Sequence, residues 1–182
     1  MRRVAFLALW LALVLPAAEA GELRAGFAKR EITPDKPVPL GGYSARFGRL
    51  SDGVHDPVYA RALVLDDGQS RMALVVLDVI GIDRRCREAV LRALRGKVDL
   101  EPDCLMMSAT HTHAGPGALA RDLHWWVAMG PYDDRLFRRT AALAAEAILE
   151  AFSRLAPARL GISQDALEGF NRNRRVDDGP RD

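Results

Sequence analysis

Two apolar runs on either side of a turn signal constrain the fold of this chain more than any other feature. Residues 58–65 and 72–80 are rich in Val, Leu and Ile, and the tripeptide Asp66-Asp67-Gly68 lies between them. Asp-Gly is a strong signal for the tight turn of a β-hairpin. We therefore expect the two runs to pair as an antiparallel hairpin.

The remaining elements follow from apolar spacing and from the placement of Pro and Gly. The expected strands are residues 23–33, 104–109 and 158–163, the expected helices are 82–95 and 133–155, and the expected irregular segments are 34–57, 110–118 and 121–130, the last being a loop or a short helix. This order predicts an α/β fold, a layered mixed β-sheet with flanking helices. The polar residues after position 167 show no packing pattern, so we expect an incomplete domain.

Residues 1–20 have the pattern of a secretory signal peptide. Arg2 and Arg3 form a basic start, residues 4–16 are almost wholly apolar, and Ala18 and Ala20 are the small residues that a signal peptidase reads. The alternative is an uncleaved anchor, which the short apolar run and the lack of a stop-transfer pattern disfavour. We expect cleavage after Ala20 and a secreted or periplasmic protein.

Charge and cysteine content limit the classes of function. The formal net charge is +2, whereas a nucleic-acid-binding chain normally carries a basic stripe, so we expect no nucleic-acid partner. Export permits a disulfide between Cys86 and Cys104. Both cysteines also lie in apolar patterns and can equally be small buried side chains, so the sequence leaves the bond open.

A histidine pair is the most informative feature for function. Residues 109–117 read Ala-Thr-His-Thr-His-Ala-Gly-Pro-Gly, with His111 and His113 just after a predicted buried strand. Ligand sites in α/β sheets lie outside the carboxyl ends of strands. Side chains at positions i and i+2 of an extended segment point to the same side, so both imidazoles can reach one metal ion. Two histidines are still too few, because a catalytic zinc has about three protein ligands.

Chance is the simpler explanation of the pair, since the chain has four histidines and two can fall close together without a shared role. His55 fits a surface residue. His124, next to Trp125 and Trp126, fits an amphipathic patch in a loop. The position of the pair at a strand end, beside a Gly-Pro-Gly turn, favours a metal site over chance.

Several segments in a fixed order resemble the neutral/alkaline non-lysosomal ceramidase family. Residues 109–117 are similar to the zinc-site motif of that family. The other matching segments are residues 26–34 (Gly-Phe-Ala-Lys-Arg-Glu-Ile-Thr-Pro), Gly41-Gly42-Tyr43, residues 59–65 (Tyr-Ala-Arg-Ala-Leu-Val-Leu), Asp78 and Asn173-Arg174. Ala114 departs from the family pattern, because many members have serine there.

The resemblance implies a role for each matching residue. His111 corresponds to a ligand of Zn2+. His113 and Arg174 correspond to active-site residues that contact the substrate or stabilise the developing oxyanion. Asp78 would orient a metal-bound histidine through a hydrogen bond to the ring nitrogen that does not bind the metal, or it would cap a turn.

The implied activity is zinc-dependent hydrolysis of the N-acyl amide bond of a ceramide-like sphingolipid. N-acyl-sphingosine would be the partner, with association at a membrane surface, and Trp125 and Trp126 would line the acyl-chain mouth unless they simply pack. The second zinc histidine, the glutamate, the tyrosine and the serine segment of the family have no counterpart before Asp182. We therefore expect residues 21–182 to be the N-terminal portion of a truncated catalytic domain, inactive alone. A hydrolase of another amide or ester, and a non-catalytic remnant or binding module, stay open as alternatives.

Overall fold

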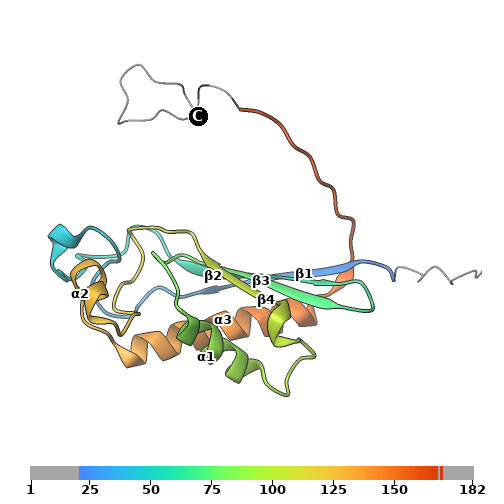
Figure 1. The fold of residues 1–182 in the computed structure, drawn as a ribbon, viewed down its shortest axis with the longest axis horizontal. Coiled ribbons are helices and arrows are strands. Elements are labelled where there is room, and N and C mark those ends of the chain that lie inside the picture. Colours follow the sequence, from blue (N-terminus) through green and yellow to red (C-terminus); the bar gives the residue numbers. More distant parts are fainter. Residues whose placement is uncertain (1–20, 168, 170–182) are drawn as a thin grey trace, which may run out of the picture.

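A mixed sheet forms the centre of the molecule (Figure 1). The computed structural model describes residues 21–167 and 169, so the expected signal peptide lies outside the described residues. The strands of the described part are β1 (Arg24–Glu31), β2 (Tyr59–Asp66), β3 (Arg71–Leu77), β4 (Leu105–Ala109) and β5 (Ala156–Pro157), in the spatial order β4-β3-β2-β1-β5. The predicted α/β fold with a mixed sheet is confirmed.

The predicted hairpin is the pair β2 and β3, which runs antiparallel from the turn at Asp66 and Arg71. The Asp66 carboxylate accepts hydrogen bonds from the Gly68 amide (2.8 Å) and from Arg71 Nε (2.9 Å). Gly68 has a φ of 84°, a left-handed conformation that glycine adopts without steric cost. β1 pairs antiparallel with the other edge of β2, whereas β4 pairs parallel with β3. A parallel pair needs a crossover, and helix α1 (Arg84–Leu94) supplies it.

Two helices cover one face of this sheet (Figure 1). Helix α3 (Asp134–Ser153) packs across β1 and β2, and α1 packs beside α3. Both helices begin at an aspartate that caps free backbone amides, since Asp83 accepts from the Cys86 amide (2.9 Å) and Asp133 from the Leu136 amide (3.0 Å). These caps explain why the helices begin at residues 84 and 134.

Close approach of α3 to the sheet depends on small residues. Ala144, Ala147 and Ala151 of the helix are fully buried. A Cβ atom placed on Gly26 of β1 would lie 2.0 Å from the Ala151 carbonyl oxygen, so only glycine fits there. The core therefore lies between α3 and the sheet, where Val64, Val75 and Leu77 are also fully buried.

The other face of the sheet carries apolar side chains that no helix of the described residues covers. Phe27 is 53% exposed, Met72 46% and Met106 62%. Phe27, Leu63, Leu74 and Met106 stand in one row across β1, β2, β3 and β4 by strand register. The two faces of the sheet thus differ sharply in their packing.

One expectation for the chain after α3 differs from the structure. The predicted strand 158–163 is wrong, because strand β5 is Ala156–Pro157 and residues 158–167 are irregular. The Ala158 amide still donates to the Leu23 carbonyl (2.8 Å), whereas residues 159–167 are exposed. Strand β1 begins at Arg24, so an antiparallel partner has nothing to pair with beyond that point. In the segment before α3, where a loop or a short helix was expected, residues 123–129 form the short helix α2 (Leu123–Met129).

Both cysteines are free, with Cys86 buried on α1 and Cys104 partly exposed. The sequence left a disulfide open, and the structure has none. Among the described residues, no helix combines the length and the apolar character that crossing a membrane requires.

Candidate active site

The histidine pair lies where β4 ends, at the edge of the sheet. His111 has a φ of 59°, so the segment turns directly after the strand and is not extended as expected. A left-handed conformation costs a non-glycine residue about 1–2 kcal/mol, a strain typical of functional sites. The turn brings the two rings face to edge, with centroids 5.1 Å apart and the Nε2 atoms of His111 and His113 3.5 Å apart.

The His111 ring is fixed by the backbone of the segment that follows β3. Its Nδ1 lies 2.7 Å from the carbonyl oxygen of Ile80. A carbonyl oxygen can only accept, so Nδ1 carries the proton and Nε2 of the neutral ring keeps a free lone pair. Metal-ligating histidines commonly show this arrangement, in which the far nitrogen donates to a carbonyl and fixes the ring. His111 is thus set up to ligate a metal through Nε2.

The His113 ring is enclosed by the loop that contains Gly42 and Tyr43. The Tyr43 ring meets it edge to face, with centroids 4.6 Å apart. A Cβ atom on Gly42 would lie 2.2 Å from His113 Nδ1, so the imidazole rests directly on the glycine backbone. His113 Nδ1 is buried there and has no hydrogen-bond partner.

The loop around residues 39–46 is joined to the histidine segment by backbone and side-chain bonds. The Gly41 amide donates to the Gly115 carbonyl (3.0 Å), and Arg46 Nη1 donates to the His113 carbonyl (2.7 Å). A Cβ atom on Gly115 would lie 2.3 Å from the Asp78 carbonyl oxygen. This glycine therefore permits close backbone packing between the histidine segment and the end of β3.

Asp78 follows β3, and its carboxylate turns toward the neighbouring strand. Oδ2 accepts hydrogen bonds from Arg61 Nη1 (2.6 Å) and from the Tyr59 amide (2.9 Å). Those bonds fix the end of β2 against β3. The Nδ1 partner of the His111 ring is the Ile80 carbonyl, and the hydrogen bonds of the Asp78 carboxylate run to β2.

An apolar cavity of about 180 Å³ adjoins His111. Its other lining residues come from α1, α2, α3 and the loops between them, and they include Ile82, Cys86, Leu119, Trp125, Met129 and Phe137. Trp125 thus lies in the wall of a cavity beside the histidine pair, whereas Trp126 is not part of that wall. Burial raises the pKa of the Cys86 thiol to about 11, with a smaller contribution from Asp83, so the thiol is a packing group and not a nucleophile.

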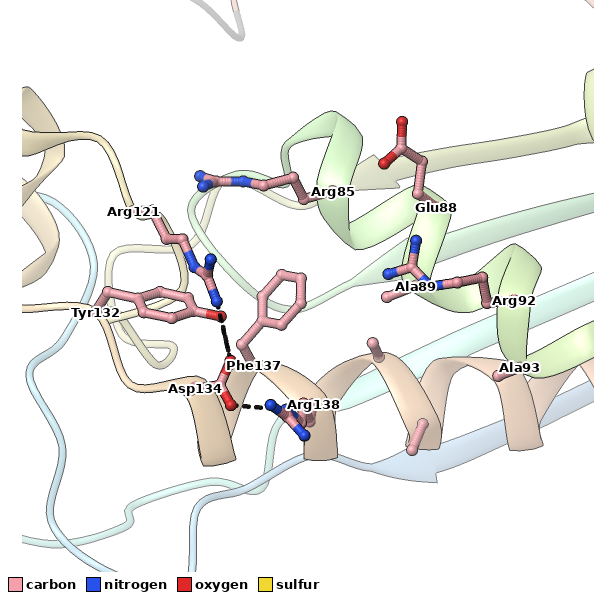
Figure 2. A pocket seen from close by; sticks show the side chains of 12 residues that line it. Arg85, Glu88, Ala89, Arg92, Ala93, Arg121, Tyr132, Asp134, Phe137 and Arg138 are labelled. Carbon is pink, nitrogen blue, oxygen red and sulfur yellow. Dashed lines mark hydrogen bonds and ion pairs between the residues drawn. The ribbon is translucent and has the colours of Figure 1, made fainter.

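A second hollow, which we call the arginine groove, lies between α1 and α3. Figure 2 shows its arginine side chains, Arg85, Arg92, Arg121 and Arg138, with Tyr132 and Asp134 at its end. The Asp134 carboxylate accepts from the Tyr132 hydroxyl (3.0 Å), Arg121 (3.2 Å) and Arg138 (2.6 Å), and these bonds hold the pKa of Asp134 below its usual value.

The bonded charges in the arginine groove are satisfied by one another. Burial raises the pKa of the Tyr132 phenol. The pKa of Arg121 is raised by the hydrogen bond of this arginine to Tyr132. This end of the groove therefore ties the segment before α3 to the helix and leaves no poised acid or base.

The remaining two histidines contact other side chains. His55 is exposed and contacts Asp56 (2.7 Å), and His124 packs against the Trp125 ring with centroids 5.0 Å apart. Across the described part of the chain, no three His, Cys, Asp or Glu side chains converge on a point that could hold a metal. Arg174, the predicted site arginine, lies outside the described residues, as does Asn173.

Two features of the site have no clear signal in the sequence. Arg46 is one of 26 basic residues, and nothing in its local pattern marks it as a contact of the histidine segment. The apolar cavity joins α1 to α2 and α3, which lie much later in the chain. In the loop that encloses His113, the sequence marks only Gly41-Gly42-Tyr43, through its resemblance to a known family.

Comparison with known proteins gives a consistent result. Residues 24–177 match the family model described as neutral/alkaline non-lysosomal ceramidase, N-terminal. The neutral ceramidase of Pseudomonas aeruginosa is 32% identical over 97% of this chain, and that of Drosophila pseudoobscura is 26% identical over 94%. The chain spans only 28% and 25% of the length of these two relatives.

Solved structures agree with the sequence relatives. The crystal structure of neutral ceramidase from Pseudomonas aeruginosa superposes with a TM-score of 0.66 at 28% identity, covering 75% of this chain and 22% of the other. A structure described as ceramidase complexed with C2 gives a TM-score of 0.65 at 25% identity with the same coverage. The family match extends over most of the sheet, both covering helices and the histidine segment, and the chain therefore belongs to the neutral/alkaline non-lysosomal ceramidase family.

Proposed function

We propose that this chain carries part of a zinc-dependent site that hydrolyses the N-acyl amide bond of ceramide-like sphingolipids. One observation supports this proposal above the others: two imidazoles with Nε2 atoms 3.5 Å apart stand beside an apolar cavity. A hydrolytic centre for a lipid amide needs polar groups at the bond and an apolar space for the chain. The relatives named neutral ceramidases give the substrate class.

His111 is the residue that would hold the zinc ion. Its Nε2 lone pair is free because Nδ1 donates to the Ile80 carbonyl. Zinc in a site of this kind supplies Lewis-acid polarisation of a carbonyl and acidifies water. The described residues provide fewer than three converging ligands, so we expect zinc affinity to be weak in this chain.

His113 and Arg174 would stabilise negative charge on the carbonyl oxygen of the amide. His113 Nε2 lies within reach of the same small volume as His111 Nε2, so a group held there can accept a hydrogen bond from it. The role of Arg174 rests on the family resemblance alone.

The cavity beside His111 would take part of the acyl chain. Its volume of about 180 Å³ is below the roughly 300–1,000 Å³ of sites that enclose a whole drug-sized ligand. The cavity therefore fits one end of a lipid rather than an entire ceramide. Trp125 in its wall supplies an optical probe of occupancy.

Metal binding tests the role of His111. Zinc titrated into the 182-residue chain should bind at one site, and His111→Ala should lower the affinity about tenfold or more, the effect of losing one of few ligands. His55→Ala removes an exposed histidine and is the matched control. Equal zinc affinity in wild type and His111→Ala, measured by calorimetry, would contradict the assignment.

Lipid binding tests the substrate class. A short-chain N-acyl-sphingosine in detergent micelles should change Trp125 fluorescence, and Trp126→Phe should leave that change in place. Hydrolysis of a fluorescent N-acyl-sphingosine by this chain should stay at background, because the ligand set of the described residues is incomplete. Binding of a matched ester with equal affinity would favour the broader hydrolase alternative, and no lipid response at all would favour a non-catalytic remnant.

We also propose export of the chain and contact of the mature protein with a membrane surface. The basic and apolar pattern of residues 1–20 supports export. The mass of the secreted product would show cleavage after Ala20, and a product that retains residues 1–20 would contradict it. Co-sedimentation with lipid vesicles would test surface contact.

A further inference from the structure

The Nδ1 atoms of His111 and His113 have opposite surroundings. His111 Nδ1 faces the Ile80 carbonyl at 2.7 Å. His113 Nδ1 is buried against Gly42 and has no partner. This buried nitrogen is unsatisfied whether it carries the proton or a lone pair, and an unpaired buried N–H is the rarer of the two cases in folded proteins. The proton of neutral His113 is therefore better placed on Nε2, the opposite tautomer to that of His111.

Hydrogen bonding between the rings agrees with this assignment. His111 Nε2 has only a lone pair, and His113 Nε2 lies 3.5 Å from it. With a proton on His113 Nε2, a donor faces an acceptor, whereas the other tautomer would set two lone pairs against each other. The two rings thus present different groups to the same space, a lone pair from His111 and an N–H from His113.

The His113 ring keeps this orientation through contacts from one loop. Arg46 Nη1 donates to the His113 carbonyl at 2.7 Å and lies near the Gly41 carbonyl at 3.5 Å, so it links the loop to the histidine segment. The Arg46 guanidinium also stacks 4.9 Å from the Tyr43 ring, and that ring packs on the imidazole. Gly42, with a φ of 79°, forms the floor.

We propose that Arg46 is a positioning residue that, through Tyr43 and Gly42, seals Nδ1 of His113 and holds the ring as the Nε2–H tautomer. His113 then acts toward a substrate carbonyl as a hydrogen-bond donor and leaves ligation to His111. This assignment rests on the proposed function for its chemical meaning, but the tautomer itself is a property of the chain without metal or lipid.

Side-chain 15N NMR of the histidine-labelled 182-residue chain at pH 8.5 tests the proposal, since ordinary imidazoles are neutral about two pH units above 6.5. Wild type should show Nδ1–H for His111 and Nε2–H for His113. Exposed His124, whose ring packs on Trp125 without a hydrogen bond to another described residue, serves as the reference, and His→Gln variants assign the signals. An Nδ1–H tautomer for wild-type His113 overturns the proposal.

Substitution of Arg46 provides the second part of the test. In Arg46→Ala, His113 should gain the Nδ1–H form by about fivefold or more, the shift expected when one charged hydrogen bond is lost. Arg46→Lys should restore the wild-type spectrum in part, because lysine can still donate to the His113 carbonyl. Arg49→Ala is the matched control, since Arg49 is an exposed neighbour that pairs with Asp52.

An Arg46→Ala spectrum identical to wild type would overturn the role of Arg46. If zinc fails to bind the wild-type chain while the tautomers are as predicted, the proposed function fails and this inference stands. If zinc binding depends on His111 but Arg46→Ala leaves the His113 tautomer unchanged, this inference fails and the proposed function stands.

Discussion

The two faces of the sheet are built from similar apolar side chains but are packed differently. On one face α3 crosses β1 and β2, and Leu77, Val75 and Val64 are fully buried. On the other face Phe27 and Met106 are 53% and 62% exposed. Alternation along each strand sends successive side chains to opposite faces, so both environments occur within single strands.

This contrast teaches that apolar character in a strand does not reveal which face is buried. Strands buried on both faces read as continuous apolar runs, and β3 reads that way although only one of its faces is covered within the described residues. The chain spans about a quarter of the length of its relatives. Four measurements test this difference between the two faces.

The largest effect is expected from a matched pair of leucines in β3. Leu77→Ala, on the covered face, should lower the free energy of unfolding by about 3–4 kcal/mol, because it leaves a cavity in the core. Leu74→Ala, on the open face, should cost about 1 kcal/mol or less. Urea denaturation of both variants measures the difference, and equal losses would mean that the second face is covered in solution.

Cysteine reactivity gives the next effect. The Cys86 thiol has a pKa raised to about 11 by burial, so at pH 8 its thiolate fraction is on the order of one part in a thousand. Cys104 is partly exposed. Iodoacetamide at pH 8 should modify Cys104 at least about tenfold faster than Cys86, as measured by peptide mass spectrometry. Similar rates would show that the covered face opens readily.

Asp66 is the one charged side chain buried on the covered face among the described residues. Bonds from Arg71 and then from the Gly68 amide lower its pKa from the ordinary 3.8. A lowered folded-state pKa means that this contribution to stability is complete above pH 3.8 and is lost as the pH falls through the lower folded-state value.

Asp66→Asn should therefore destabilise the fold by about 1–2 kcal/mol at pH 7, from weaker bonds to Arg71 and Gly68. The difference from wild type should shrink as the pH falls below 3.8. Denaturation at pH 7 and pH 3 measures it, with exposed Asp52→Asn as the control. A gap that is constant with pH would contradict the role of the charge.

The smallest effect is expected at Thr140 in α3. Its hydroxyl is buried and has no hydrogen-bond partner. Thr140→Val should leave stability unchanged or raise it by up to about 1 kcal/mol, because it removes an unpaired polar group. Thr140→Ser keeps the hydroxyl and loses the methyl group, so it should be the less stable variant. A loss of stability in Thr140→Val would indicate a bound water or ligand group at this position.

Much of the fold could be predicted from the sequence because its signals are local. The hairpin follows from Asp-Gly between two apolar runs, and both helices begin directly after the aspartates that cap them. The strand predicted at 158–163 failed, because a strand exists only where a partner runs alongside. Its apolar alternation says nothing about where β1 begins.

The site was predictable only in part, since its contacts are not local. The position of His111 and His113 after a strand was readable from the chain. How the two rings come together could not be predicted, because a left-handed φ of 59° at His111 replaces the expected extended segment. Asp78 could be placed at a strand end, but its bond to Arg61 depends on the pairing of β2 with β3.

Residue types at short separations along the chain account for most of the elements, for the family and for the two histidines. Only the tertiary structure decided which face of the sheet is buried and which nitrogen of each histidine is enclosed. Those properties depend on residues 31 and 67 positions away, the separations of His111 from Ile80 and of His113 from Arg46. Contacts between such distant segments are fixed by packing of the whole domain, and no local pattern records them.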